Sequence, residues 1–327
     1  MSQLIRLCIV LLFMASSTAS MAKLLAVRGH SVDRDCALLV ALQRAGRLTQ
    51  SKCGIVRGPR DETKIALIFT AGDYAEGYAD VRRALNAVNG KASFFFTGDF
   101  LRTERFRPLV REVLREGHYI GPHSDKHLEL VGEDGRTLVP RKVFDRDLRN
   151  NLVELERSGA DVSNIRFWIP PNETYNRELS EWSSESGVKL FNFSPGTYSN
   201  ADYLGDHERG FIDNETIEKS IFDLAARPQG LNGFLLLLHL GAGPERSVPF
   251  SARLPALLAR LAQMGYRFVR VDELLAPEPR PATPHRRRFG NSSGTRLYER
   301  PIRCNGRLTH NHATACAVFT GGDHANR

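Results

Sequence analysis

The chain has 327 residues, of which 25% are charged and 42% hydrophobic, with a formal net charge of +8. This composition excludes a wholly disordered or fibrous chain, and the length allows one large domain or two small ones. The positive charge is concentrated between Arg280 and His310, where eight arginines face one acidic residue, Glu299. Because the remainder is close to neutral, we expect no nucleic-acid-binding surface on the folded part.

The segment Met1–Ala22 has the pattern of a secretory signal peptide. Arg6 precedes the apolar run Leu7–Ala15, which is followed by small residues. This run is too short to span a bilayer. We therefore predict an exported protein, periplasmic or extracellular, with no membrane span once the signal is removed. The alternatives are a first core helix or a membrane anchor.

Residues 23–63 are predicted to form an N-terminal extension. It has one helical segment around Ala37–Ala45 and carries no recognisable functional motif. An exported chain permits disulfide bonds, although the sequence fits four unpaired cysteines as well. Four cysteines remain beyond the signal: Cys36, Cys53, Cys304 and Cys316.

Short apolar strands alternate with amphipathic helices over residues 64–276. The strand-like runs are Ile65–Phe69, Ala92–Phe96, Tyr119–Pro122, Arg166–Ile169, Lys189–Phe193, Phe234–His239 and Tyr266–Val271. The helices are expected near Val81–Val88, Pro108–Leu114, Phe144–Leu155, Glu178–Ser186, Thr216–Ala226 and Ala252–Met264. Strands linked by helices pair in parallel, because a parallel crossover needs a connection of this length. The pattern predicts an α/β fold that closes into a TIM-barrel-like barrel, with an open doubly wound sheet as the alternative.

Two histidines four positions apart, His123 and His127, follow the third predicted strand. The carboxyl ends of barrel strands are where functional groups gather. If the two imidazoles share one face of a helical turn, they can bind one metal ion. Asp73, after the first strand, is then the natural third ligand and leaves one position open for water. The alternative is two surface histidines near the start of a helix.

Further candidates stand at the ends of other strands. His239 ends the apolar run Phe234–Leu238, which suits a general acid near neutral pH, although a hydrogen-bonded core histidine is the alternative. Glu173 and Tyr175 lie in a polar loop after two prolines, where they either bind sugar hydroxyls or satisfy the loop backbone. The candidate substrate-binding residues are Tyr175, Pro171 and Asp202.

From about Lys64 to Leu275 the chain resembles the polysaccharide deacetylase family, the NodB-homology group of carbohydrate esterases. The family's first motif, Thr-Phe-Asp-Asp-Gly, corresponds to Thr70–Tyr74. The second, His-Ser/Thr-x-x-His, is matched in full by His123–His127. The third, Arg-Pro-Pro-Tyr, is matched partly by Ile169–Asn172, and the last, Leu-Leu-His, by Leu237–His239. The combination and order of these motifs are specific, although each one alone is weak.

The resemblance implies a distorted (β/α)7 barrel and a hydrolase that removes acetyl groups from a polysaccharide or envelope glycan. Such a reaction breaks a carbon–nitrogen bond that is not a peptide bond. The resemblance also implies one divalent metal, usually zinc, bound by Asp73, His123 and His127, which would polarise the acetyl carbonyl and activate water. His239 would then protonate the leaving amine or alcohol.

The first and third motifs depart from the family at functional positions. Gly72 stands where the family has its catalytic base, and Ile169 stands where it has the arginine that orients this base. Glycine cannot accept a proton, and the loss of a positioned base slows a reaction by about 10²–10⁴-fold. Glu76 and Glu173 are the nearest candidate replacement bases. A catalytically impaired protein that binds metal and carbohydrate is therefore the alternative function.

The C-terminal region beyond the predicted barrel falls into two parts. Residues 277–312 are rich in proline and arginine and are predicted to form a linker. The later stretch Phe319–Ala325 repeats Phe69–Ala75, with five of the seven positions identical. We therefore predict that residues 313–327 are the truncated start of a second module, with chance similarity as the alternative. Nucleic-acid binding by Arg286–Arg288 is a weaker hypothesis, because no stacking aromatics are interleaved.

Overall fold

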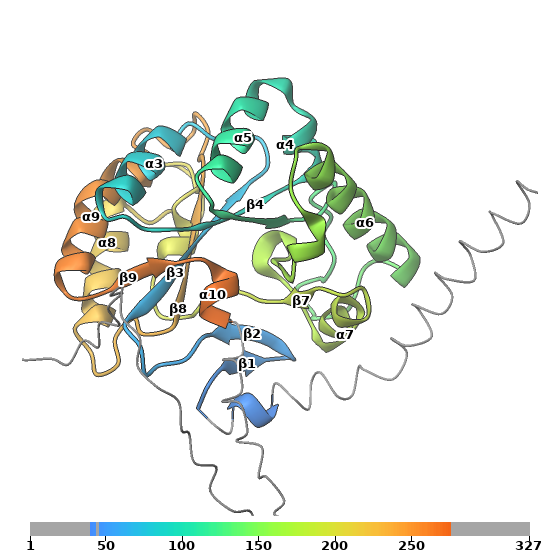
Figure 1. Ribbon diagram of the computed structural model, residues 1–327, viewed down its shortest axis with the longest axis horizontal. Helices are drawn as coiled ribbons and strands as arrows, with labels where there is room; N and C mark the ends of the chain where they lie inside the picture. Colours follow the sequence, from blue (N-terminus) through green and yellow to red (C-terminus); the bar gives the residue numbers. More distant parts are fainter. Residues whose placement is uncertain (1–39, 44–45, 276–327) are drawn as a thin grey trace, which may run out of the picture. The chain divides into compact units, whose positions relative to one another are not determined.

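The computed structural model describes residues 40–43 and 46–275, all within the first of two compact units of the chain (Figure 1). The predicted signal peptide, the linker 277–312 and the possible second module 313–327 lie outside the described residues, as do residues 23–39 of the N-terminal extension. Of the four cysteines considered above, only Cys53 is described, and it is disulfide-bonded. Its partner therefore lies outside the described residues.

The central strand of the fold is β3 (Lys64–Ala71), in which seven of eight residues are buried. A continuous apolar run is typical of a parallel strand that is covered on both faces. Along one edge β3 pairs with β8 (Phe234–His239). Two short strands share the remainder of β3: β9 (Arg267–Val269) pairs with its first half and β4 (Ser93–Phe96) with its second half. The next strand, β5 (Tyr119–Pro122), pairs with β4, and all these pairs are parallel.

A separate parallel pair, β6 (Phe167–Trp168) and β7 (Lys189–Leu190), continues the barrel beyond β5. The Tyr119 hydroxyl bridges the junction with β6. It accepts hydrogen bonds of 3.0 Å from the main-chain N–H groups of Arg166 and Phe167. A side chain thus replaces the ladder bonds that are absent between these two strands, which accounts for the distortion of the barrel.

An antiparallel hairpin of β1 (Thr49–Ser51) and β2 (Gly54–Arg57) lies between β7 and β8. An isolated bridge between Ile55 and Phe191 joins β2 to the end of β7. The Ser194 hydroxyl donates to the main chain of β2 and accepts from the main chain of β8. This hairpin, which the sequence did not predict, therefore helps to close the barrel.

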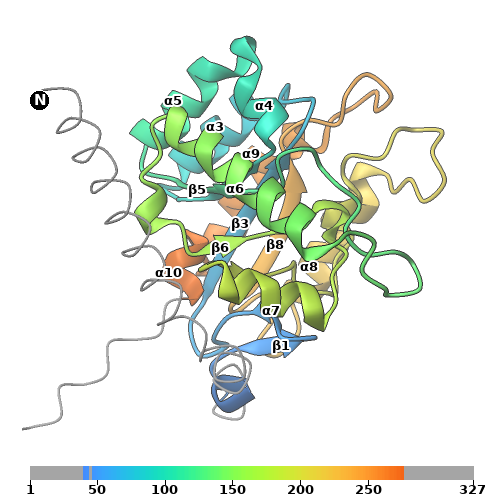
Figure 2. The same ribbon diagram turned by 90° about the vertical axis from the view of Figure 1, so that its right-hand side faces the viewer.

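Helices surround the strands on the outside (Figures 1 and 2). They are α3 (Tyr78–Ala87), α4 (Gly98–Arg102), α5 (Arg107–Arg115), α6 (Arg141–Arg157), α7 (Arg177–Glu185), α8 (Asn214–Ala225), α9 (Leu254–Gln263) and α10 (Val271–Leu275). The six predicted helices are confirmed, whereas α4 and α10 have five residues each and were too short to show a helical period. In the part of the chain that the structure describes, no helix is long and apolar enough to cross a membrane.

The hydrophobic core consists of two clusters on opposite faces of β3. Because side chains alternate along a strand, Ile65, Leu67 and Phe69 join the first cluster, which includes residues of the surrounding helices. The second cluster fills the barrel interior, where the Phe95 and Phe191 rings from opposite walls lie 5.1 Å apart. The seven strands β3 to β9 and their helices confirm the predicted distorted (β/α)7 barrel.

Candidate active site

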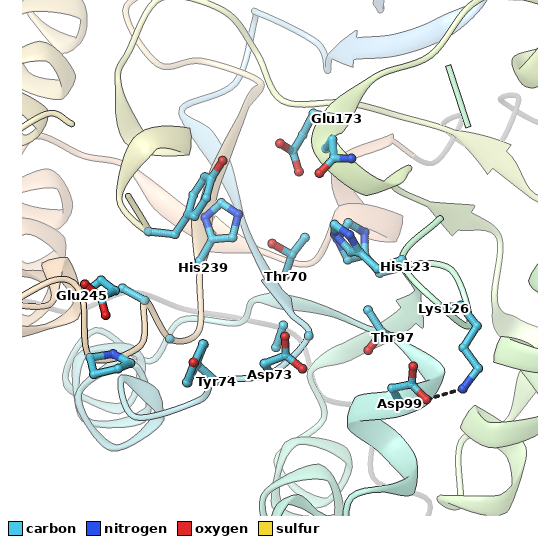
Figure 3. Close-up of a pocket in the computed structure, with 18 of the residues that line it drawn as sticks. Thr70, Asp73, Tyr74, Thr97, Asp99, His123, Lys126, Glu173, His239 and Glu245 are labelled. Carbon is cyan, nitrogen blue, oxygen red and sulfur yellow. Dashed lines mark hydrogen bonds and ion pairs between the residues drawn. The ribbon is translucent and has the colours of Figure 1, made fainter. Parts of the chain in front are cut away.

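One pocket lies at the carboxyl ends of the strands, with a cavity of about 550 Å³ (Figure 3). This size is in the range of pockets that bind small ligands. Five of the nine site residues predicted from the sequence line it: Asp73, His123, His127, Glu173 and His239.

The two histidines of the second motif lie on a loop after β5, not on a helical turn. Ser124 and His127 adopt positive φ angles of 71° and 50°, so the loop bends through left-handed conformations. The rings of His123 and His127 nevertheless lie together, with centroids 5.1 Å apart and planes at 71°. The prediction of a shared helical face was therefore wrong, but the prediction that the imidazoles are neighbours is confirmed.

Two buried side chains on α6, Asp147 and Asn151, hold this loop in place. The Asp147 carboxylate accepts hydrogen bonds from the main-chain N–H groups of Asp125 and Lys126 at 3.0 and 3.1 Å. The Asn151 side-chain oxygen accepts one from the His123 main chain at 2.8 Å. The sequence interpretation missed both residues. The available signal was a pair of polar residues, four positions apart, on the buried face of an amphipathic helix.

The tautomer of His123 is set by a main-chain carbonyl directly after β6. Its Nδ1 lies 3.0 Å from the carbonyl oxygen of Ile169, which only accepts, so Nδ1 carries the hydrogen and Nε2 keeps a free lone pair. Burial lowers the pKa of His123 to about 3, and burial also lowers the pKa of His127. Both imidazoles are therefore neutral near pH 7.

His239 is held by Asp202. The carboxylate lies 2.7 Å from Nδ1 of His239 and also accepts from its main-chain N–H. Burial opposes a charge on this imidazole, but the neighbouring carboxylate outweighs it and raises the pKa of His239. The Tyr203 ring lies against the imidazole, with centroids 4.3 Å apart. Asp202, which was predicted to bind substrate, is buried, does not line the pocket and bonds His239.

Three other predicted site residues do not line the pocket. Glu76 Oε1 accepts hydrogen bonds, each 2.7 Å long, from two main-chain N–H groups in the loop after β8, which corrects its prediction as a replacement base. Tyr175 is buried, and its hydroxyl donates to the carbonyl of Ser51 in β1. Pro171 is also buried. Tyr175 and Pro171 therefore belong to the core and not to a substrate-binding surface.

Glu173, in contrast, lines the pocket together with His239 (Figure 3). Glu173 and the preceding Asn172 have φ angles of 53° and 55°, a left-handed conformation that is uncommon for residues other than glycine. No hydrogen bond to the Glu173 carboxylate comes from residues 40–43 or 46–275. Burial raises the pKa of this carboxyl group, and His239 opposes the shift.

The predicted three-ligand metal site is not formed. Asp73 is exposed, and it lines the same pocket as His123 and His127. Among the described residues, no three His, Cys, Asp or Glu side chains are placed to hold a metal ion. The neutral imidazoles of His123 and His127 have the donor chemistry for a divalent ion such as zinc, but the carboxylate that should complete the site does not join them.

Comparison with known proteins assigns the family. Residues 57–191 match the family model described as polysaccharide deacetylase. This segment belongs to the polysaccharide deacetylase family. Its relatives include a peptidoglycan-N-acetylglucosamine deacetylase from Bacillus cereus, 28% identical over 66% of this chain and 90% of the relative. The enzyme of the same description, PgdA, from Listeria monocytogenes is 25% identical over 70% of this chain and 42% of its own.

Solved structures of similar proteins share the fold of this deacetylase domain. A CE4 family pseudoenzyme from Bacillus anthracis has a TM-score of 0.54 at 15% identity, covering 69% of both chains. The Bc1960 peptidoglycan N-acetylglucosamine deacetylase has a TM-score of 0.53 at 22% identity, covering 67% of this chain and 91% of the other. The same fold thus occurs in a protein described as a pseudoenzyme and in one described as an enzyme.

Proposed function

We propose that the chain is an exported hydrolase that removes acetyl groups from an N-acetylated glycan. Membership of the polysaccharide deacetylase family and relatives described as peptidoglycan-N-acetylglucosamine deacetylases support this reaction. The signal-like segment Met1–Ala22 supports export to the periplasm or the extracellular space. The observation that carries the proposal is the pairing of His239 with Asp202, since His239 lines one pocket with Glu173, His123 and His127.

In this proposal His239 is the general acid. When the amide bond of an acetamido sugar breaks, the departing nitrogen must gain a proton. Asp202 fixes Nδ1 of the imidazole, which leaves Nε2 to exchange a proton with substrate. Because the pKa of His239 is raised, more of the imidazole carries the proton near neutral pH, as a proton donor requires.

Glu173 is the proposed replacement base. The usual base position is Gly72, and the Glu76 carboxylate is occupied by main-chain N–H groups. Glu173 offers a carboxylate that lines the pocket and receives no hydrogen bond from the described residues. Its raised pKa makes it a stronger acceptor of the proton from the attacking water. We propose no catalytic step through zinc or another metal, because the third donor is not in place.

Binding of an acetylated glycan without turnover is the second candidate function. It is favoured by Gly72 in place of the base and by the separation of Asp73 from the histidine pair. Under this alternative, His239 and the exposed tyrosines around it would still bind a sugar, but acetate would not be released.

Acetate release from N-acetylated chito-oligosaccharides and peptidoglycan tests the proposal. We expect slow release by the unmodified chain and a further loss of about 10²-fold in His239→Ala. The matched control is His207→Ala, because His207 is exposed and does not line the pocket. Glycan binding with no acetate release above the protein-free background would instead establish the second candidate.

A further inference from the structure

Tyr74 stands where the family's first motif ends in glycine. It follows β3, lines the pocket, and leaves 46% of its surface exposed (Figure 3). Compared with the family motif, a large side chain thus stands two positions after Gly72, where the motif has its catalytic base. Exposed aromatic rings at a pocket are common ligand-contacting groups, because they combine a rigid apolar body with a polar tip.

The Tyr74 ring is supported by the loop that follows β8. Gly243 has a φ angle of 73°, and a Cβ atom there would lie 2.7 Å from the tyrosine ring. At Gly241 a Cβ atom would come within 2.6 Å of the Tyr74 main chain. Both positions therefore need glycine for the two loops to approach each other this closely.

Glu76 holds the loop that carries Tyr74 against the loop that follows β8. Its Oε1 accepts hydrogen bonds of 2.7 Å from the N–H groups of Ala242 and Gly243, and the Gly77 N–H donates to the Leu240 carbonyl at 3.0 Å. The loop that carries Tyr74 is thus bonded at Glu76 and at Gly77 to the loop that follows β8. A ring that is fixed before the ligand arrives loses little conformational freedom on binding, which favours affinity.

A second exposed tyrosine, Tyr203, contacts His239 in the same pocket. Tyr203 lines the pocket, is 43% exposed, and contacts the His239 ring. We infer that Tyr74 forms an additional wall of this pocket, against which the apolar face of a pyranose ring binds. This inference rests on the proposed function only in taking an N-acetylated glycan as the ligand.

The charges in the pocket indicate which kind of sugar binds there. Four carboxyl groups that line it have no lysine or arginine partner among the described residues: Asp73, Glu173, Glu208 and Glu245. The lining residue Lys126 is paired with Asp99 at 2.5 Å. An acidic pocket repels a carboxylated sugar, whereas the hydroxyl and amide groups of a neutral sugar can donate hydrogen bonds to carboxylates. We therefore assign to the Tyr74 wall an uncharged N-acetylhexosamine.

Titration calorimetry with N-acetylchitotetraose tests this assignment. We expect Tyr74→Ala to weaken binding about tenfold, since removal of an aromatic contact at a binding site has an effect of this order. Tyr74→Phe should keep the affinity within about twofold, because the ring remains. Tyr198→Ala is the matched control: Tyr198 is 53% exposed but does not line the pocket, and this variant should bind as the unmodified chain does. A tetramer of galacturonic acid should not bind.

Two results would overturn the inference. Unchanged affinity in Tyr74→Ala would show that the ring does not contact the glycan, and increased affinity would show that it blocks the pocket. Acetate release is measured in parallel, so that the two proposals fail separately. Binding that depends on Tyr74, without acetate release, would contradict the proposed hydrolase activity and support the inference that Tyr74 contacts the glycan. Acetate release with binding independent of Tyr74 would do the reverse.

Discussion

The histidine side of the pocket and the first-motif loop (Gly72–Gly77) are built in different ways. On the histidine side, His123 is oriented by the Ile169 carbonyl and His239 by Asp202. In the first-motif loop, the base position is glycine, Asp73 is exposed, and Glu76 is bonded to main chain. The histidine side of the pocket therefore has supporting contacts for its imidazoles, whereas the first-motif loop departs from the family motif at the base position.

The largest expected effect comes from returning a base to the first-motif loop. A Cβ atom at Gly72 would have Thr97 Cγ2, at 3.8 Å, as its nearest neighbour, so the position has room for a side chain. We expect Gly72→Asp to raise the rate of acetate release by about 10²-fold or more. Gly72→Asn, which fills the same space without a basic oxygen, is the control. Equal rates in the two variants would contradict the view that a missing base limits turnover.

Glu173→Gln should lower acetate release by about 10²-fold, because it removes the proposed base with little change in shape. The pH profile gives a sharper result. The base must be deprotonated and His239 protonated, and both pKa values are raised, so activity should rise and then fall at higher pH than for ordinary carboxyl and imidazole groups. In Glu173→Gln the acid limb should disappear. An unchanged acid limb would assign the base to another group.

The zinc affinity of variants shows which side chains of the pocket bind the metal ion. Only the two imidazoles are together, so we expect weak binding that His123→Ala weakens further, by about tenfold or more. Asp73→Asn should leave the affinity within about twofold, because this carboxylate does not join the pair. Calorimetric titration of the two variants makes the comparison. An equal loss of affinity in both would mean that Asp73 is the third ligand after all.

The smallest expected effect concerns the support of the histidine loop. Asn151→Ala removes the buried amide that holds the His123 main chain, and should lower the free energy of unfolding by about 1–3 kcal/mol. Asn150→Ala, an exposed residue next to it on α6, should change stability by about 0.5 kcal/mol or less. Denaturant unfolding measures both. Equal stability of the two variants would contradict the view that Asn151 stabilises the loop that carries His123.

The sequence predicted the barrel well because buried strands such as β3 and β8 are continuous apolar runs. It did not predict the hairpin β1–β2, whose three- and four-residue strands are too short to show a pattern. In the pocket, residue types and strand ends identified His123, His127 and His239. The conformation of the pocket loops could not be predicted from the sequence. Ser124 and His127 have left-handed backbone conformations although they are not glycine. The contact of Glu76 with the loop after β8 joins residues 166 positions apart.

One experiment that changes both sides of the pocket tests the central claim, that His239 is a working proton donor although the family's usual base position is Gly72. Acetate release is measured for Gly72→Asp alone and for Gly72→Asp with His239→Ala. We predict that the single variant gains activity and that the double variant loses this gain, by about 10²-fold. If the double variant released acetate as fast as the single variant, His239 would not be the proton donor and the account would be contradicted.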